Sequence, residues 1–321
     1  MVEGDCVRAD HEREEGAIFR TATDETETRP RPTTDGGYGT VLDLHAERDP
    51  GSADWYRQLL VVAETEYRLA LRSRWALAMT AIFAAFALGL TTFSGSSASP
   101  EGFERTVASL AVLAVYLVPL VALAFGYDAV VGREASGWLH TLFALPVARG
   151  WLVVGTAVGR AVVLASATIV GFAVAGGFLL AEFGLTGADA YVRFVLVTVC
   201  LGLAFLAVAV LVSTLAREKT HALGASLLAW AWFVLVHDLL GLGLVAAFDL
   251  PDTAVSALVL ANPTGVYRAL VLGSLDAGGD AGFATILAEA GLSTPVLATV
   301  MIAWIVLPTA LATIAIRRRR L

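Results

Sequence analysis

Few residues of this 321-residue chain have the types and spacing that chemistry requires. The two cysteines, Cys6 and Cys200, are too few for a disulfide framework, and the three methionines are far apart. No two histidines share a helix face at the spacing of metal ligands; the five are His11, His45, His140, His221 and His237. The chain therefore offers no set of soft ligands for copper or zinc, and we expect no metal site.

Nucleotide hydrolysis would require a glycine-rich turn that ends in lysine followed by serine or threonine, because the ammonium group must reach the β- and γ-phosphates. The only lysine is Lys219, and Ala216-Arg217-Glu218 before it contains no glycine. Gly36-Gly37-Tyr38-Gly39 is glycine-rich, but no predicted strand or helix flanks it, so we interpret it as a linker. Any hydrolysis of ATP with Mg²⁺ would therefore take place on a separate polypeptide.

An intramembrane serine protease is the best enzymatic alternative for a chain this apolar. Such an enzyme would use an activated serine in a Gly-x-Ser-Gly turn and a histidine on a neighbouring helix. Here Leu227 follows Gly224-Ala225-Ser226, and the last apolar run has no histidine. We therefore expect no catalytic residue on this chain.

Three ionisable residues fall well inside apolar runs, where a charge is costly and indicates function. They are Arg160, His237 and Asp238. The long side chain of Arg160 could reach back to the membrane interface. A carboxylate cannot reach as far, so three environments remain open for Asp238: an ion pair with Arg160, a solvated cavity, or the start of an outer vestibule.

The composition separates an acidic tail from a membrane body. Hydrophobic residues make up 57% of the chain and the mean hydropathy is +0.72, which is too apolar for a soluble domain. More than half of the 29 acidic residues precede residue 71. Residues 1–50 cannot bury enough apolar area to offset their ordering entropy, and we expect them to be disordered. The net charge of −7 argues against a nucleic-acid partner.

The rest of the chain predicts an all-α membrane protein. Residues 51–74 form an amphipathic pattern, expected to be an interfacial helix that precedes the first span. Residues 75–321 form the membrane domain. Six apolar runs there are near the ~20 residues that a bilayer requires; they lie at about 75–94, 106–126, 151–181, 191–214, 222–247 and 295–316.

Basic residues near the ends of the runs predict that both termini are cytoplasmic. One side carries Arg68, Arg72, Arg74, Arg133, Arg149, Arg217, Lys219 and Arg317 to Arg320, whereas the other carries only Arg105, Arg193 and Arg268. The long outer loop from Asp249 to Thr294 holds two apolar stretches around Asn262-Pro263. This pattern is typical of a re-entrant-like helix pair, whose broken ends need protein partners at membrane depth.

Small residues recur along the third run at Gly155, Gly159, Ala167, Gly171 and Ala175. Such spacing lets two helix backbones approach closely. We expect this face to pack against another helix.

The segment between the second and third runs is charged although both of its neighbours are apolar. Residues 127–155 carry Asp128, Arg133, Glu134, His140 and Arg149. Within them, Ala135 to Ala144 form a short amphipathic pattern closed by Leu145-Pro146. A charged loop with its own helix is typical of a docking element for a cytoplasmic protein.

Three segments resemble the ABC-2 family of transporter permeases. Val131-Gly132-Arg133-Glu134-Ala135-Ser136-Gly137-Trp138-Leu139, followed by Leu145-Pro146-Val147-Ala148-Arg149, is similar to the first cytoplasmic loop of that family, with Trp138 in place of a threonine. Glu64 with Tyr67-Arg68 and Arg72-Ser73-Arg74-Trp75 resembles its pre-span helix, and Asn262-Pro263 with Tyr267-Arg268 its last outer segment. The resemblance covers about residues 55–321 and is greatest to the NosY-like permeases of nitrous-oxide-reductase maturation.

The resemblance implies a non-catalytic half-transporter in the cell membrane. Two permeases, identical or different, would pair among membrane lipids, and each would dock on an ABC ATPase subunit through a coupling helix in the first loop. The docking residues would be Arg133, Glu134, Trp138, Leu139, Leu142, Phe143, Pro146 and Arg149, with Arg217, Glu218 and Lys219 in the second cytoplasmic loop. Export is the expected direction. A membrane anchor that recruits an ATPase or maturation factor without transport is the alternative, and the cargo remains open.

Overall fold

The computed structural model describes residues 54–93, 100–135, 149–185, 187–248, 250–272 and 292–318. The chain divides into two units, Met1–Asp49 and Pro50–Leu321, and every described residue belongs to the second. The predicted disordered tail therefore lies outside the described residues. Helices and turns, without a strand, make up the described part, which confirms the all-α prediction. Helices satisfy their own backbone polar groups, as lipid requires.

Six helical stretches in the described part are long and apolar enough to cross a bilayer, and they coincide with the six predicted runs. These spans are α3 (Trp75–Phe93), α4 (Pro100–Gly126) leading into α5 (Val131–Ala135), α7 (Arg149–Phe183), α8 (Ala188–Leu215), α9 (Lys219–Trp230) continuing through the π-helical turn η1 (Ala231–Val236) into α10 (His237–Ala247), and α14 (Thr294–Arg318).

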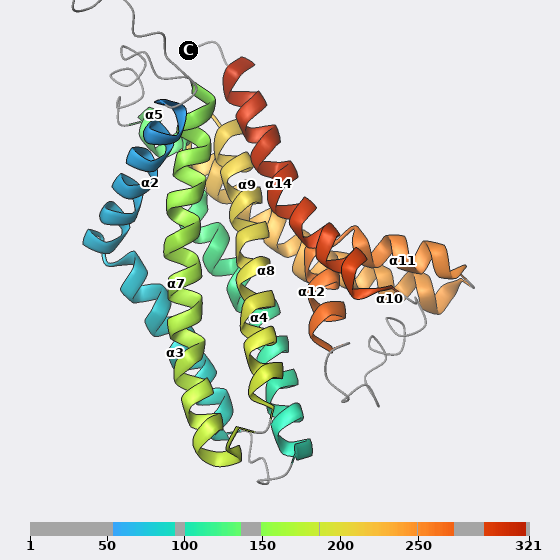
Figure 1. Ribbon diagram of the computed structural model, residues 1–321. Coiled ribbons are helices and arrows are strands. Elements are labelled where there is room, and N and C mark those ends of the chain that lie inside the picture. The colour runs from blue at the N-terminus through green and yellow to red at the C-terminus, as the bar shows by residue number, and fades with distance from the viewer. Residues whose placement is uncertain are drawn as a thin grey trace, which may run out of the picture. The chain divides into compact units, whose positions relative to one another are not determined.

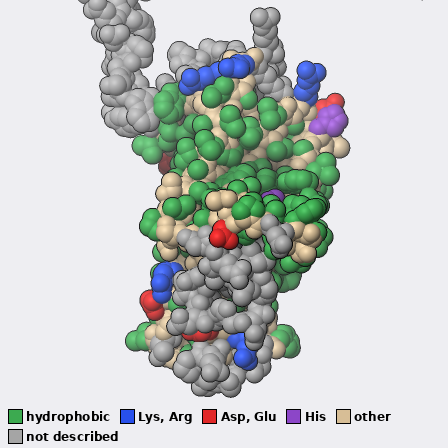
Figure 2. Space-filling view, turned by 90° about the vertical axis from the view of Figure 1, so that its right-hand side faces the viewer, with side chains coloured by type: hydrophobic (Ala, Val, Ile, Leu, Met, Phe, Trp, Pro, Cys, Tyr) green, Lys and Arg blue, Asp and Glu red, His purple; other side chains and the backbone are tan. Residues whose placement is uncertain are grey.

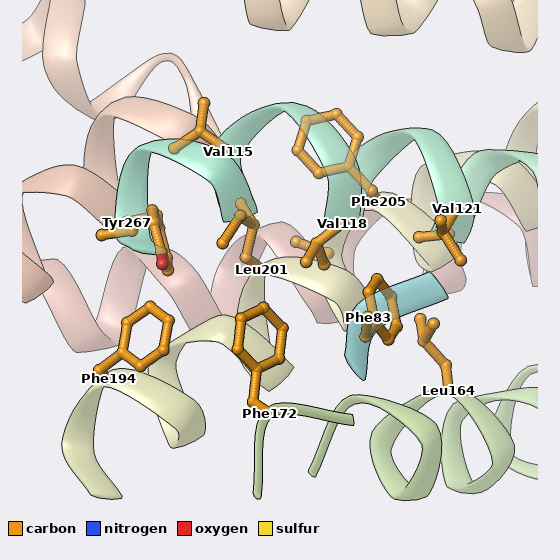
Figure 3. Close-up of a cluster of buried hydrophobic side chains, with 14 of the residues drawn as sticks. Phe83, Val115, Val118, Val121, Leu164, Phe172, Phe194, Leu201, Phe205 and Tyr267 are labelled. Atoms are coloured by element: carbon orange, nitrogen blue, oxygen red, sulfur yellow. The ribbon is translucent and has the colours of Figure 1, made fainter. Parts of the chain in front are cut away.

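Two long central helices, α7 and α8, organise the bundle (Figure 1). α7 packs against α8, α3 and the amphipathic helix α2 (Asp54–Arg72), whereas α8 also packs against α4 and α14. Buried side chains from all of these helices belong to one hydrophobic cluster, part of which Figure 3 shows. Phe172 of α7 stacks on Phe83 of α3 at 5.9 Å between ring centroids and meets Phe194 of α8 edge-on at 5.4 Å.

Glycines on α7 allow the close approach of its neighbours. A Cβ atom at Gly159 would lie 2.6 Å from the Ala63 carbonyl oxygen of α2, and one at Gly171 would lie 2.5 Å from Phe83 Cβ of α3. The small-residue face therefore packs against other helices of the same chain, as expected of helix packing in membranes. On the face of α2 that packs against α7, Glu66 is buried and Val62 and Ala63 are half-buried, whereas Tyr67, Leu69 and Leu71 are exposed.

Hydrophobic side chains cover most of the described surface in Figure 2, and Lys and Arg side chains lie above and below this apolar band. The fifth span is the least buried of the six, with 11% of its most apolar window buried, and its C-terminal part, α10, projects from the side of the bundle together with α11 (Asp252–Leu260) (Figure 1). A contiguous apolar surface of this kind is expected of a chain that spans a membrane.

The predicted helix pair in the long outer loop is present. α11 and α12 (Pro263–Leu272) meet at a bend of 105° around Asn262-Pro263. Trp304 of α14 donates a hydrogen bond to the Leu260 carbonyl at the end of α11. Asn262 Oδ1 accepts a bond from the Thr264 amide at the start of α12, so a protein side chain bonds a backbone group at each of the two helix ends.

Candidate functional site: two buried polar clusters

A cluster of four charged side chains lies where the charged loop leaves the bundle. The loop-root cluster comprises Glu66 of α2, Asp128 in the turn after α4, Arg133 of α5 and Arg160 of α7. Glu66 forms an ion pair with Arg133 and lies 3.5 Å from Arg160 Nε. Arg160 Nη1 also lies 2.8 Å from Asp128 Oδ1 and donates to the Phe125 carbonyl. Two carboxylates and two guanidinium groups make this cluster electrically neutral.

Arg133 is the residue that connects the loop to the helices. Its guanidinium group bonds Glu66 on α2 and donates to Thr156 Oγ1 on α7 at 2.7 Å. The side chains of Glu66, Arg133 and Arg160 are 7%, 15% and 13% exposed. Pairing is required at such burial, because an isolated charge there would lose its hydration without compensation. The cluster therefore fixes α5 to two neighbouring helices.

Ser213 and Lys219 place the second predicted cytoplasmic loop next to the first. Ser213 Oγ, near the end of α8, accepts hydrogen bonds from the Val130 and Val131 amides at 2.9 and 3.2 Å. These amides lie at the start of α5, where a helix has no internal acceptors for them. Lys219, the first residue of α9, has its Cε 3.5 Å from the position of a Cβ at Gly132. Both loops therefore adjoin α5.

A cavity of about 310 Å³ borders the loop-root cluster. The four charged residues line one part of it, and Leu69, Trp75 and Phe125 line another. The cavity is thus amphipathic, with its charges already paired within the protein. We assign it no ligand.

A second cluster joins the fifth span to the bent helix pair. The helix-pair cluster comprises His237, Asp238, Asn262 and Arg268. Arg268 of α12 donates to Asp238 at 2.5 Å, and both side chains are less than one-fifth exposed. Asn262 Nδ2 lies 3.1 Å from His237 Nδ1 and 3.4 Å from Asp238 Oδ1. Asp238 therefore forms an ion pair, but its partner is Arg268. The pair with Arg160 that the sequence left open is wrong.

The π-helical turn explains why Asn262 is buried. A π-helical turn disturbs the regular carbonyl-to-amide ladder of a span, and such turns are frequent at functional sites. The Phe233 carbonyl within η1 accepts bonds from Asn262 Nδ2 at 2.8 Å and Thr264 Oγ1 at 3.3 Å. The break between α11 and α12 therefore supplies the donors that the fifth span needs.

Most of the predicted docking residues lie outside both clusters. The predicted coupling helix, with Trp138, Leu139, Leu142, Phe143 and Pro146, lies outside the described residues, as do the side chains of Glu134 and Arg149. Arg217 and Glu218, between α8 and α9, and Lys219, the first residue of α9, are exposed. The docking role of all these residues remains a prediction. Among the described residues, no group of three His, Cys, Asp or Glu side chains could hold a metal ion.

Sequence reasoning missed the partners in both clusters. Glu66 lies at the i+4 position from Val62 on the buried face of α2, and a charge on such a face needs a buried counter-charge. That signal was available. Thr156 and Ser213 gave none, because hydroxyl groups in apolar helices usually bond the carbonyl of the preceding turn, as Thr198 does here.

Comparisons with known proteins identify the family. The model of the ABC-2 family transporter proteins matches residues 60–321. The chain is 36% identical over 267 residues to the "Probable ABC transporter permease protein NosY" of Pseudomonas aeruginosa, which covers 80% of this chain and 97% of that protein. It is 35% identical over 274 residues to the protein of the same name from Stutzerimonas stutzeri, covering 82% and 99%. These matches confirm the predicted resemblance, and the chain belongs to the ABC-2 family as a multi-pass membrane subunit of the ABC transporter type.

Proposed function

We propose that this chain couples ATP hydrolysis on a separate nucleotide-binding subunit to the export of a substrate across the cell membrane. In this proposal both termini are cytoplasmic, and two permeases pair, each docked on one ATPase. The ATPase binds ATP and Mg²⁺. The names of the two relatives support a permease, since both are described as ABC transporter permease proteins.

The observation that carries the proposal is the attachment of Arg133. ATP-driven movement of a docked protein can reach the spans only through a part of the loop that is fixed to them. Arg133 lies at the start of the loop and is bound to both α2 and α7. Ser213 holds the same short helix to the end of α8. A displacement of the loop would therefore be transmitted to α2, α7 and α8 and would not be absorbed by bending of the loop alone.

The proposed docking contact is mainly apolar. Exposed ion pairs contribute only about 0–1 kcal/mol each, so Glu134 would contribute little at the contact itself. Arg133 is buried and already paired with Glu66, so it would act by holding the loop rather than at the contact. Trp138, Leu139, Leu142 and Phe143 would provide most of the buried area. Aromatic and aliphatic anchors of this type dominate the energetics of protein interfaces.

The test is the double substitution Trp138→Asp and Leu142→Asp in the full chain, produced together with its ATPase and purified through a tag on the permease. We expect the variant to lose the co-purifying ATP hydrolysis while its thermal unfolding midpoint stays that of the wild type. Leu185→Asp is the matched control, because Leu185 is 82% exposed in the turn after the other end of α7.

Retention of the ATPase by the double variant would show that this loop is not the docking element. Substrate-stimulated ATP hydrolysis in the wild-type complex, reconstituted in vesicles, separates a transporter from an anchor that recruits an ATPase without transport. Labelling of a cysteine introduced at His140 by a membrane-impermeant reagent from outside the cell would contradict the proposed orientation.

A further inference from the structure

A groove on the outside of the bundle has no role in the proposed coupling. It lies between α7, α8 and α14 and has a volume of about 360 Å³. Its lining is almost entirely apolar and includes Ala157, Ala161, Leu206, Ile305, Ala310 and Thr313. Small side chains on α7 and α14 leave this groove open between the helices, and its lining residues belong to three of the six candidate membrane spans.

One end of the groove is basic. Thr313 lines the groove, and Arg317 follows one turn later on α14. A Cβ atom at Gly150, in the first turn of α7, would lie 3.0 Å from Thr313 Cγ2 and also 3.0 Å from Arg317 Nε. The Arg317 guanidinium group therefore lies at the mouth of the groove, over the N-terminal turn of α7. That turn adds partial positive charge to the same place.

Arg317 and Arg318 are available to bind an anion. Both are exposed in the last turn of α14, and within the described part of the chain neither has an acidic partner within 4 Å. A guanidinium group binds a phosphate group through paired hydrogen bonds. Basic residues beside a span attract anionic headgroups, and two such residues correspond to a preference of roughly tenfold or more.

We propose that this groove binds an anionic phospholipid, with one acyl chain between α7 and α14 and the phosphate group on Arg317, while Arg318 adds positive charge at the same end of α14. The acyl chains of all phospholipids are as apolar as the groove, so contacts with the acyl chain favour no particular lipid. The basic mouth supplies the selectivity, and the groove supplies the position. Free phosphate could bind the guanidinium groups, but it has no acyl chain to occupy the groove.

The protein contains a comparison groove of similar size. It lies between α7 and α8, has a volume of about 390 Å³ and is lined by apolar residues that include Ala173, Val192 and Leu196. Arg193, next to Val192, forms an ion pair with Asp189 at 2.8 Å. This second groove can hold an acyl chain, but the guanidinium group beside it already has an acidic partner.

The experiment is native mass spectrometry of the full chain in detergent, titrated with phosphatidylglycerol or with phosphatidylcholine of the same acyl chains. We expect phosphatidylglycerol to bind about tenfold or more tightly. Arg317→Gln with Arg318→Gln should abolish this preference. Equal binding of the two lipids by the wild type, or an unchanged preference in the double variant, would overturn the proposal.

Replacing one alanine in each groove by phenylalanine tests the groove itself. Ala310→Phe fills the proposed site and should weaken phosphatidylglycerol binding at least fivefold, whereas Ala173→Phe in the comparison groove should not. Both alanines are exposed, so neither change alters the core. Val306→Trp, from a position 54% exposed on the same wall, replaces Ala310→Phe if that variant unfolds. Equal effects at the two grooves would refute a specific site, and displacement of the lipid by millimolar inorganic phosphate would show a phosphate site instead.

Discussion

Replacing Glu66 by glutamine should loosen the attachment of the charged loop to the membrane helices. Glu66 is the only carboxylate in the loop-root cluster that contacts both guanidinium groups, and its side chain is 7% exposed. The substitution keeps the shape and removes the charge. Asp128, which pairs with Arg160, is then the one carboxylate left among the four residues of the cluster, so the neutral cluster gains a net positive charge.

The magnitude follows from what each guanidinium group retains. Breaking a buried ion pair by removing one partner typically costs about 3–5 kcal/mol. Arg133 keeps its bond to Thr156 at 2.7 Å, and Arg160 keeps Asp128 at 2.8 Å. We therefore expect the lower end of the range, about 3 kcal/mol, which corresponds to a change of roughly 100-fold in an equilibrium constant.

Thermal unfolding of the detergent-purified permease measures this effect, with ATP hydrolysis by the proposed complex with an ATPase as a second readout. We expect Glu66→Gln to lower the unfolding midpoint by several degrees and to reduce the stimulation of the ATPase by the permease. The matched control is Glu64→Gln, two residues earlier on the same helix. Glu64 is 60% exposed and paired with Arg68, which is 69% exposed, so its loss should change stability by less than about 1 kcal/mol.

A double-substitution cycle with Arg133→Ala would attribute the loss to the pair itself, since residues in contact show coupling of about 0.5–3 kcal/mol. If Glu66→Gln and Glu64→Gln unfold at the same temperature and stimulate the ATPase equally, the loop-root cluster does not hold the loop. The central argument for coupling would then be wrong.

Three further predictions concern glycine and asparagine. Gly159→Ala should separate α2 from α7 and lower the unfolding midpoint in detergent, because the new Cβ would meet the facing backbone oxygen at 2.6 Å. Gly187→Ala should destabilise the protein by more than Gly184→Ala in chemical unfolding; both have positive φ, 83° and 70°, but only at Gly187 would the Cβ meet another side chain, at 2.5 Å. Asn262→Asp should cost about 1–3 kcal/mol, because it removes the donor to the Phe233 carbonyl, and faster amide exchange within η1 would report the loss.

The spans could be predicted from the sequence because lipid imposes a simple rule on length and polarity. All six apolar runs became helices close to the predicted positions, and the break at Asn262-Pro263 separates α11 from α12 as expected. The family could also be identified, since the loop pattern around Arg133 and Arg149 is specific and the family model covers residues 60–321.

Side-chain pairing could not be predicted to the same extent. Arg160 and Asp238 both stood out as intramembrane charges, yet their partners come from segments 30 or more residues away, Asp128 and Arg268. The rotation of each helix about its own axis determines which charged side chains face each other, and the sequence does not give this rotation. The irregularity at η1 was also not predicted, because an apolar run gives no sign of where its hydrogen-bond ladder shifts by one residue.

The length of α7 has a geometric consequence. Its 35 residues form a rod of about 50 Å at ~1.5 Å per residue, whereas the hydrocarbon core is only about 30 Å thick. A rotation of about 10° around its midpoint would displace each tip by roughly 4 Å, with almost no movement at the centre. Gly171 and Phe172, packed against Phe83, lie within two turns of that midpoint, where the same rotation displaces the helix by only about 1.5 Å. A larger swing at the tips is therefore compatible with a nearly undisturbed aromatic contact.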